Sequence, residues 1–253
     1  MQQVSPPSPF PTHGRTYSRE RRVRLGDVTP KGRLRLDATA RYLQDIATDD
    51  ALDGSYDDPH GWVVRRTEIW VHHFPKYLDD LVLTTWCGGV GSHWAERRTR
   101  IAIAGELDAP PAMEAASLWV RVDLNTLKPL PLSDGFRGLI GEAAAGRKVS
   151  ARLLVGRDLP TNVQSVPRVN VPLRFSDFDA IGHLNNAVYW EPLEEYLGGH
   201  RERRAPLHAT VEHHRSVEPG AVMTVSTYEL DSRVVLHLRD GDETASLIQV
   251  VSD

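Results

Sequence analysis

The sequence contains one order of predicted elements twice, and this repeat constrains the fold more than any other feature. In the first copy, a helix pattern for which Asp37 is the expected N-cap is set among strands predicted at 17–25, 62–74, 81–90, 94–104 and 113–124. In the second copy, a helix pattern over 186–197 is set among strands predicted at 168–175, 209–217, 222–230, 233–238 and 244–251. Two copies of one strand–helix–four-strand unit favour two domains packed as a pseudo-dimer.

Matching residues place the two copies in register. Arg24, Asp27 and Gly32 match Arg174, Asp177 and Gly182 at a constant offset of 150. The repeat predicts a disordered lead over 1–14, a first domain over 15–134, a linker over 135–167 and a second domain over 168–253.

The two copies differ in chemistry. The second copy has Asp179, His183 and Asn185 at the positions where the first has Thr29, Arg33 and Arg35. Neither a threonine hydroxyl nor a guanidinium acts as a base at neutral pH. The first copy is therefore interpreted as a degenerate half that shapes the pocket.

Residues 174–186 close the predicted strand, form a polar turn and open the helix of the second copy. Asn185 or Asn186 is a candidate cap, because an asparagine oxygen accepts a free N–H of the first helical turn. Pro192 predicts a kink or a loose first turn, and Gly198-Gly199 predicts the helix end.

This turn also carries groups suited to chemistry at a carbonyl carbon. Asp179 is a candidate base or nucleophile, and His183 can orient it or carry a proton near neutral pH. Free N–H groups at the helix start can polarise a carbonyl oxygen. The competing interpretation is that these residues only cap the helix.

The composition of the chain limits the classes of protein to which it can belong. The chain has 253 residues, a formal charge of −4 and one cysteine, Cys87, so we expect no disulfide within the chain and a reducing, cytoplasmic location. No apolar run approaches the ~20 residues of a membrane span. His72-His73 and His213-His214 lack a convergent third ligand, so no metal site is expected.

The run Asp-x-Asp-x-x-Gly-His-x-Asn-Asn-x-x-Tyr over 177–189 resembles the signature of hotdog-fold thioesterases. The first copy is similar to the first half of acyl-acyl-carrier-protein (acyl-ACP) thioesterases of plant plastids and bacteria. The segments that carry this similarity are Gly61–Val64, Phe74-Pro75, Asp80, Thr84–Trp86, Ala116–Val120, Asp123, Thr126, Pro129 and Arg137-Gly138.

The resemblance implies an α+β fold of two tandem hotdog domains, each an antiparallel sheet wrapped around a long helix. It implies hydrolysis of fatty acyl-ACP to free fatty acid and carrier protein, without a metal or organic cofactor. Asp179 and His183 occupy the catalytic positions of the family, and Asn185 is a candidate third catalytic residue. The candidate substrate-binding residues are Trp62, Val64, Ile69, Trp119, Asn186 and Ser216.

The sequence departs from the family at two positions. Ile181 stands where the family has an asparagine, and Ser216 stands where it has an acidic residue. Glu212 or Glu218 restores a carboxylate if the register slips, and Asn185 could supply the missing amide.

An acidic carrier protein calls for a basic docking face, for which Arg201, Arg203 and Arg204 are candidates. They are expected near the site entrance. Exposed sheet edges in such a fold favour a homodimer. Three alternatives stay open: an acyl-CoA thioesterase, a non-catalytic acyl-thioester-binding protein, and a hotdog hydratase. The sequence does not indicate the preferred acyl chain length.

Overall fold

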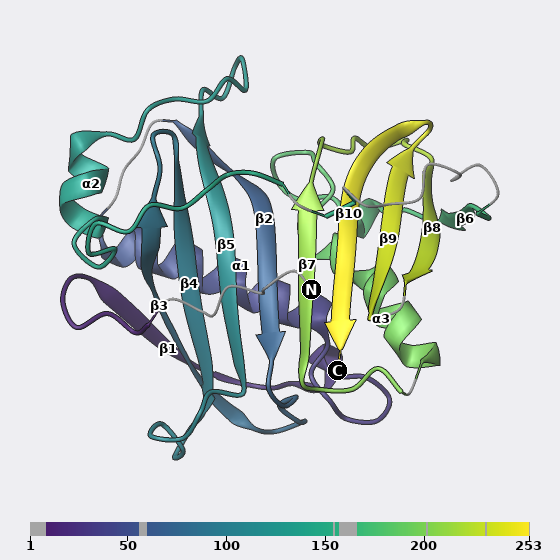
Figure 1. Ribbon diagram of the computed structural model, residues 1–253, viewed down its shortest axis with the longest axis horizontal. Coiled ribbons are helices and arrows are strands. Elements are labelled where there is room, and N and C mark those ends of the chain that lie inside the picture. Colours follow the sequence, from purple (N-terminus) through teal and green to yellow (C-terminus); the bar gives the residue numbers. More distant parts are fainter. Residues whose placement is uncertain are drawn as a thin grey trace.

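The structure, a computed structural model, is built on one large antiparallel sheet with helices on one face (Figure 1). It describes residues 9–55, 60–153, 155–156, 166–200, 202–230 and 232–252. Within these residues the strand order is β1-β3-β4-β5-β2-β7-β10-β9-β8-β6. The strands are β1 Thr16–Arg22, β2 Gly61–Val71, β3 Asp80–Val90, β4 Trp94–Ile103, β5 Met113–Val122, β6 Val169–Val171, β7 Leu207–His213, β8 Met223–Leu230, β9 Arg233–Asp240 and β10 Glu243–Ser252.

The two predicted copies form the two halves of this sheet. The strands up to β5 make one half, those from β6 onward make the other, and β2 and β7 join them as antiparallel neighbours. Ile69 on β2 pairs with Ala209 on β7 at this seam. The predicted tandem hotdog architecture is confirmed.

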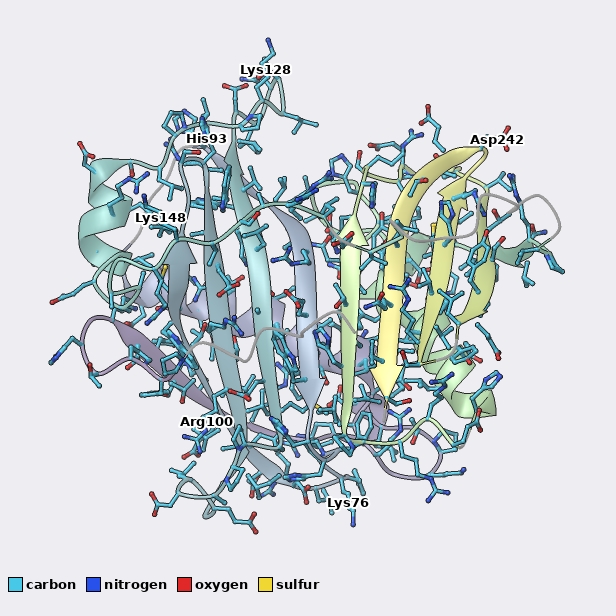
Figure 2. All side chains as sticks on the ribbon, in the orientation of Figure 1. Lys76, His93, Arg100, Lys128, Lys148 and Asp242 are labelled. Carbon is cyan, nitrogen blue, oxygen red and sulfur yellow. The ribbon has the colours of Figure 1, made fainter. Side chains whose placement is uncertain are left out.

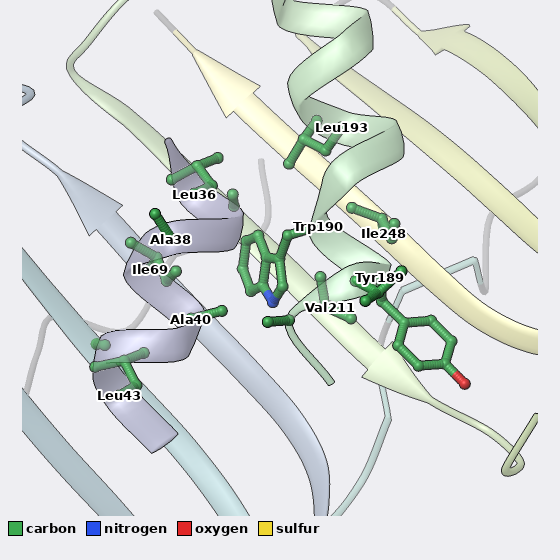
Figure 3. Packing of buried hydrophobic residues seen from close by; sticks show 14 of the residues in the cluster. Leu36, Ala38, Ala40, Leu43, Ile69, Tyr189, Trp190, Leu193, Val211 and Ile248 are labelled. Atoms are coloured by element: carbon green, nitrogen blue, oxygen red, sulfur yellow. The ribbon is translucent and has the colours of Figure 1, made fainter. Parts of the chain in front are cut away.

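The core lies between the sheet and the helix of each half. Helix α1, Leu36–Asp53, buries a stripe that includes Leu36, Ala40 and Leu43. This stripe faces Trp190 and Leu193 of the second half across the centre of the molecule (Figure 3). Each large apolar side chain buried there contributes about 1.5–3 kcal/mol. The two halves therefore share one core, although the sequence predicts two domains.

The second helix begins loosely, as Pro192 predicts. A 3-10 turn over Val188–Trp190 leads into α3, Glu191–Gly199, with Pro192 in its first turn. The missing N–H of proline costs nothing there, because first-turn N–H groups have no helical acceptor. The helix ends at Gly199, as predicted.

Two local predictions are wrong. The strand expected over 168–175 ends at Val171, because Pro172 has no N–H to continue the pairing. Phe175 is consequently 99% exposed in a 3-10 turn over Phe175–Asp177. Asp37 does not cap α1 either. It lies inside the helix, and its carboxylate accepts hydrogen bonds from Arg35 and Arg41.

The segment expected as a linker begins with a short helix, α2, Asp134–Ile140, which Ser133 caps through the Phe136 N–H. The chain then crosses the sheet face opposite to α1 (Figure 1). The Trp94 indole donates to the Val149 carbonyl there, and Arg66 donates to the carbonyl of Arg152. Residues 157–165 of the expected linker lie outside the described residues.

Figure 2 shows Lys76 and Arg100 near one end of the strands, and His93 and Lys128 near the other. Across the described ranges, no helix has the length and apolar character needed to cross a bilayer.

Candidate active site

The turn between β6 and α3 is closed by its own backbone. Asp179 N–H donates to the His183 carbonyl at 3.0 Å, and Gly182 N–H donates to the Asp179 carbonyl at 2.9 Å. Gly182 has a φ of 85°, a left-handed conformation that suits glycine because a Cβ would be strained there. The turn thus fixes Asp179 and His183 close together, at its two ends.

Asp179 is half-buried and held on both oxygens. Its Oδ1 accepts the Ile181 N–H at 3.0 Å, and the Asn185 Nδ2 lies 3.5 Å from its Oδ2. The Oδ1 of Asn185 accepts the Ala187 N–H at 2.9 Å, so Asn185 links the carboxylate to the start of the second helix. These contacts leave Asp179 lone pairs free to bind a proton from a water molecule.

His183 pairs with a carboxylate from the segment that follows β7. Its Nε2 lies 3.2 Å from Glu218 Oε1, with the His183 side chain 36% exposed. The Leu184 N–H donates to the Val217 carbonyl at 2.9 Å and holds this segment against the turn. Glu218 therefore supplies an acidic partner near the position where the sequence has Ser216. A carboxylate beside an imidazole fixes which ring nitrogen carries the proton.

Glu212 does not reach this site. It is fully buried on the opposite face of the sheet, where its Oε2 accepts the Val155 N–H at 3.1 Å. Ser216 is exposed, and its hydroxyl lies 3.5 Å from Glu218 Oε1, so the structure places it beside the carboxylate.

A second imidazole, His213, lies near the start of the second helix, edge-on to Tyr189. Burial lowers the pKa of His213 to about 3, so its ring is neutral in the physiological range. Of these two imidazoles, that of His183 is the more exposed.

A small hollow of about 20 Å³ lies at the start of the second helix, large enough for one water molecule. It is lined by Ala40, Leu43, Gln44, Val64, Thr67, Ser117, Trp119, Asn186 and Trp190. The predicted residues Val64, Trp119 and Asn186 therefore meet at one place, beside the turn that holds Asp179 and His183.

A larger cavity of about 280 Å³ lies next to this hollow, and Trp119 lines both. Its walls also include Trp62, Phe136, Leu139 and Ile140. Along α1 the two cavities extend from Ala40 to Gly54, a rise of about 21 Å. Most of the residues that line the larger cavity are apolar.

The cavity has a polar rim and an unreactive thiol. Asp50 of α1 pairs with Arg97 of β4 and with Arg15, and all three line the cavity. Burial raises the pKa of the Cys87 thiol to about 11, so Cys87 stays protonated and is a poor nucleophile.

Comparison with known proteins assigns this arrangement. The model of the acyl-ACP thioesterase N-terminal domain matches residues 14–140, and that of the acyl-ACP thioesterase C-terminal domain matches residues 161–249. The chain belongs to the acyl-ACP thioesterase family. It is a thioester hydrolase by family.

Similar proteins span bacteria and plants. An uncharacterized protein of Mycobacterium tuberculosis is 26% identical over 92% of this chain and 90% of its own length. A chloroplastic dodecanoyl-[acyl-carrier-protein] hydrolase of Cinnamomum camphora is 24% identical over 71% of this chain and half of its own length. The 12:0-ACP thioesterase of Umbellularia californica shares the fold, with a TM-score of 0.77, 20% identity and coverage of 96% and 98% of the two chains.

At position 181, where the resemblance implies an asparagine, the Ile181 side chain is 75% exposed and the residue contacts Asp179 through its backbone N–H. The Asn185 side-chain amide lies 3.5 Å from Asp179, and its role in place of the missing amide stays a prediction.

Two groups of predicted residues lie away from the turn. Ile69 is fully buried in the core and is not among the residues that line either cavity. Arg203 donates to Ser252, at the end of β7 opposite to the turn, and its role in docking stays a prediction. Arg201 lies outside the described residues, and Arg204 is close to Arg203 in sequence.

The sequence interpretation missed Gln44 and the ion pair of Asp50 with Arg97. Gln44 lies on α1, in the degenerate half, yet it lines the hollow beside Asn186. The repeat carried the signal, because Gln44 is offset by 150 from Glu194.

Proposed function

We propose that this acyl-ACP thioesterase hydrolyses fatty acyl-ACP thioesters to free fatty acid and carrier protein. The observation that supports this most is the placement of the two cavities beside the turn. Asn186, next to Asn185 of the turn that holds Asp179 and His183, lines the small hollow, and Trp119 lines both that hollow and the larger, mainly apolar cavity. A thioester carbonyl at the turn and an acyl chain in the cavity would fill both.

In the proposed reaction, Asp179 takes a proton from water while the water oxygen bonds to the thioester carbonyl carbon. The intermediate then collapses, the carbon–sulfur bond breaks, and the thiolate takes a proton. One water and one thioester thus give one carboxylic acid and one thiol. Direct attack by Asp179, followed by hydrolysis of the anhydride, gives the same products.

His183 is the proposed proton donor to the leaving thiolate. Glu218, 3.2 Å from its Nε2, would hold the imidazole and stabilise its charged form. The backbone N–H of Asn186 has no acceptor in the described part of the chain, and it would bind the carbonyl oxygen as charge develops there.

The carrier distinguishes this function from its nearest alternative, acyl-CoA hydrolysis. The test measures release of free acid from one long-chain acyl group attached in turn to acyl carrier protein and to CoA. We expect kcat/KM to favour the carrier protein. Turnover of the CoA thioester alone would transfer the protein to the other class, and tight binding without turnover of either would make it a binding protein.

A substitution inside the large cavity tests whether it holds the acyl chain. Ala47 lines the cavity from α1, and Ala47→Phe would exclude the end of a long chain. Excluding three methylenes costs about 2.4 kcal/mol at roughly 0.8 kcal/mol each, or roughly 60-fold in kcat/KM. Shorter acyl groups should be hydrolysed as before.

Leu52→Phe is the matched control, because Leu52 is 74% exposed on the same helix and lines neither cavity. An equal loss for short and long chains in Ala47→Phe, or the same selectivity change in Leu52→Phe, would place the acyl chain elsewhere.

A further inference from the structure

The turn of the catalytic half has a close structural counterpart in the first half. Thr29 N–H donates to the Arg33 carbonyl as Asp179 N–H donates to the His183 carbonyl, at 2.8 and 3.0 Å. Gly32 has a φ of 80°, against 85° for Gly182. The molecule therefore contains two equivalent sites related by the offset of 150, one with catalytic residues and one without.

Each site lies where the helix of one half passes the turn of the other. In the first half, Glu194 of α3 reaches across to the start of α1. Its Oε1 accepts the Leu36 N–H at 2.6 Å and Arg33 Nη1 at 3.0 Å, while its Oε2 accepts Arg33 Nη2 at 2.9 Å. The Leu36 N–H at the helix start thus already has a carboxylate oxygen as its acceptor. The ion pair of Arg33 with Glu194 takes up the place that a substrate oxygen would need in this half.

The offset places Gln44 of α1 at the corresponding position in the catalytic half. Leu36 corresponds to Asn186 and Arg33 corresponds to His183. Gln44 and Asn186 line the same small hollow, as this correspondence requires. Among the described residues, the Gln44 amide and the Asn186 N–H have no hydrogen-bond partners.

The charge of Glu194 suits the site in the first half, and the neutral amide of Gln44 suits the site in the second. The Glu194 carboxylate neutralises Arg33, whereas a carboxylate at position 44 would repel an oxygen that gains negative charge in the transition state. The neutral amide of Gln44 instead offers an N–H donor. In the first half, the Leu36 N–H binds a carboxylate oxygen of Glu194. By the correspondence of the two halves, an acyl carbonyl oxygen would bind the Asn186 N–H at the equivalent position in the second.

We propose that Gln44, supplied by the non-catalytic half, is a catalytic residue of the other half. Its Nε2–H donates a hydrogen bond to the thioester carbonyl oxygen, beside the backbone N–H of Asn186. This inference rests on the proposed thioesterase function. No bond is made or broken at Gln44, which stabilises the charge that forms when water adds to the carbonyl carbon.

The test compares Gln44→Met and Gln44→Glu with the wild type on the preferred acyl thioester. Gln44→Met keeps the length and the helix propensity of the side chain but removes the donor. We expect kcat to fall roughly 10²-fold, the usual loss for one oxyanion donor, with little change in KM.

Gln44→Glu gives a readout that a structural role would not affect. An ionised carboxylate at position 44 opposes the developing charge, whereas a protonated carboxyl can donate to it. Because glutamate normally has a pKa of about 4.3, we expect the loss in kcat/KM to be largest at pH 7–8 and to narrow as the pH falls toward 5.

Asp45→Ala is the matched control, because Asp45 is the exposed neighbour of Gln44 and pairs with Arg21 on the surface. Wild-type turnover with unchanged kcat in Gln44→Met, or a Gln44→Glu loss that does not vary with pH, overturns the role of Gln44 alone. A wild type that hydrolyses no acyl thioester overturns the proposed function as well. Circular dichroism and Tm show whether each variant is folded.

Discussion

Asp179→Asn should lower kcat by about 10³-fold, within the range of 10²–10⁴ that general acid–base catalysis contributes. Asparagine keeps the shape of the side chain, and its amide oxygen can still accept the Ile181 N–H that Asp179 Oδ1 accepts at 3.0 Å. The turn and the hollow beside it should therefore stay intact. What is lost is the group that takes the proton from water, so KM should change much less than kcat.

The first half offers a control at the equivalent position. Thr29 Oγ1 accepts the Lys31 N–H at 3.3 Å, which is the contact that Asp179 makes with Ile181. Thr29→Ala removes that contact from the non-catalytic turn and should leave kcat unchanged. An Asp179→Asn variant that is folded and keeps more than a tenth of the wild-type kcat would exclude Asp179 as base and as nucleophile.

Residues close together in the sequence were enough to predict the repeat and the candidate catalytic turn. Alternating apolar residues set the strands, and Gly182 marked the turn because its left-handed φ strains other residues. Pro192 predicted a loose helix start, because proline fits the first turn of a helix. The predicted strand over 168–175 extends four residues beyond β6, because Pro172 has no N–H to continue the pairing.

Contacts between distant segments were not predictable in the same way. Asp37 matches the composition of a helix cap, but Glu194 binds the first N–H of α1 from the other half of the molecule. Glu212 and Glu218 are equal candidates in the sequence. The structure separates them because β7 directs Glu212 to the opposite face, while the chain after β7 folds back to His183.

The large cavity likewise depends on tertiary packing. Helix α2 closes it by placing Phe136 with its ring centre 4.9 Å from that of Trp62. Each of the two residues on its own resembles an ordinary core aromatic. The cavity is closed here because Phe136 of α2 contacts Trp62 at the start of β2, which no local pattern specifies.

Arg33→Ala should lower the free energy of unfolding by roughly 3 kcal/mol, the low end of the cost of breaking a buried ion pair. The Glu194 side chain is 7% exposed, and both guanidinium donors of Arg33 bind its two oxygens. Without Arg33, the buried carboxylate keeps the Leu36 N–H as its partner from the start of α1. For a chain of this size, the loss corresponds to a fall in Tm of roughly 6–12 °C.

The exposed pair of Arg22 and Asp80 is the control for bidentate geometry, since both contacts are 2.6 Å and both side chains are about half exposed. Arg22→Ala should change the Tm far less, because water already solvates the charges. An equal fall in Tm for Arg22→Ala and Arg33→Ala would show that the burial of Glu194 does not determine how much its ion pair with Arg33 stabilises the protein.

The double variant Arg33→Ala with Glu194→Gln gives the first half the neutral amide that the catalytic half has in Gln44. The glutamine oxygen can still accept the Leu36 N–H, and no unpaired charge is buried. We therefore expect the double variant to recover at least half of the Tm lost in Arg33→Ala. In Arg33→Ala, the guanidinium that packs 4.3 Å above the Phe74 ring is also lost. A double variant less stable than Arg33→Ala would show that this lost packing costs more stability than the unpaired charge of Glu194. Recovery of the Tm would show that the site at Glu194 can carry a neutral amide, as the site at Gln44 does, without loss of its architecture. The first half could then lose its ion pair and remain folded.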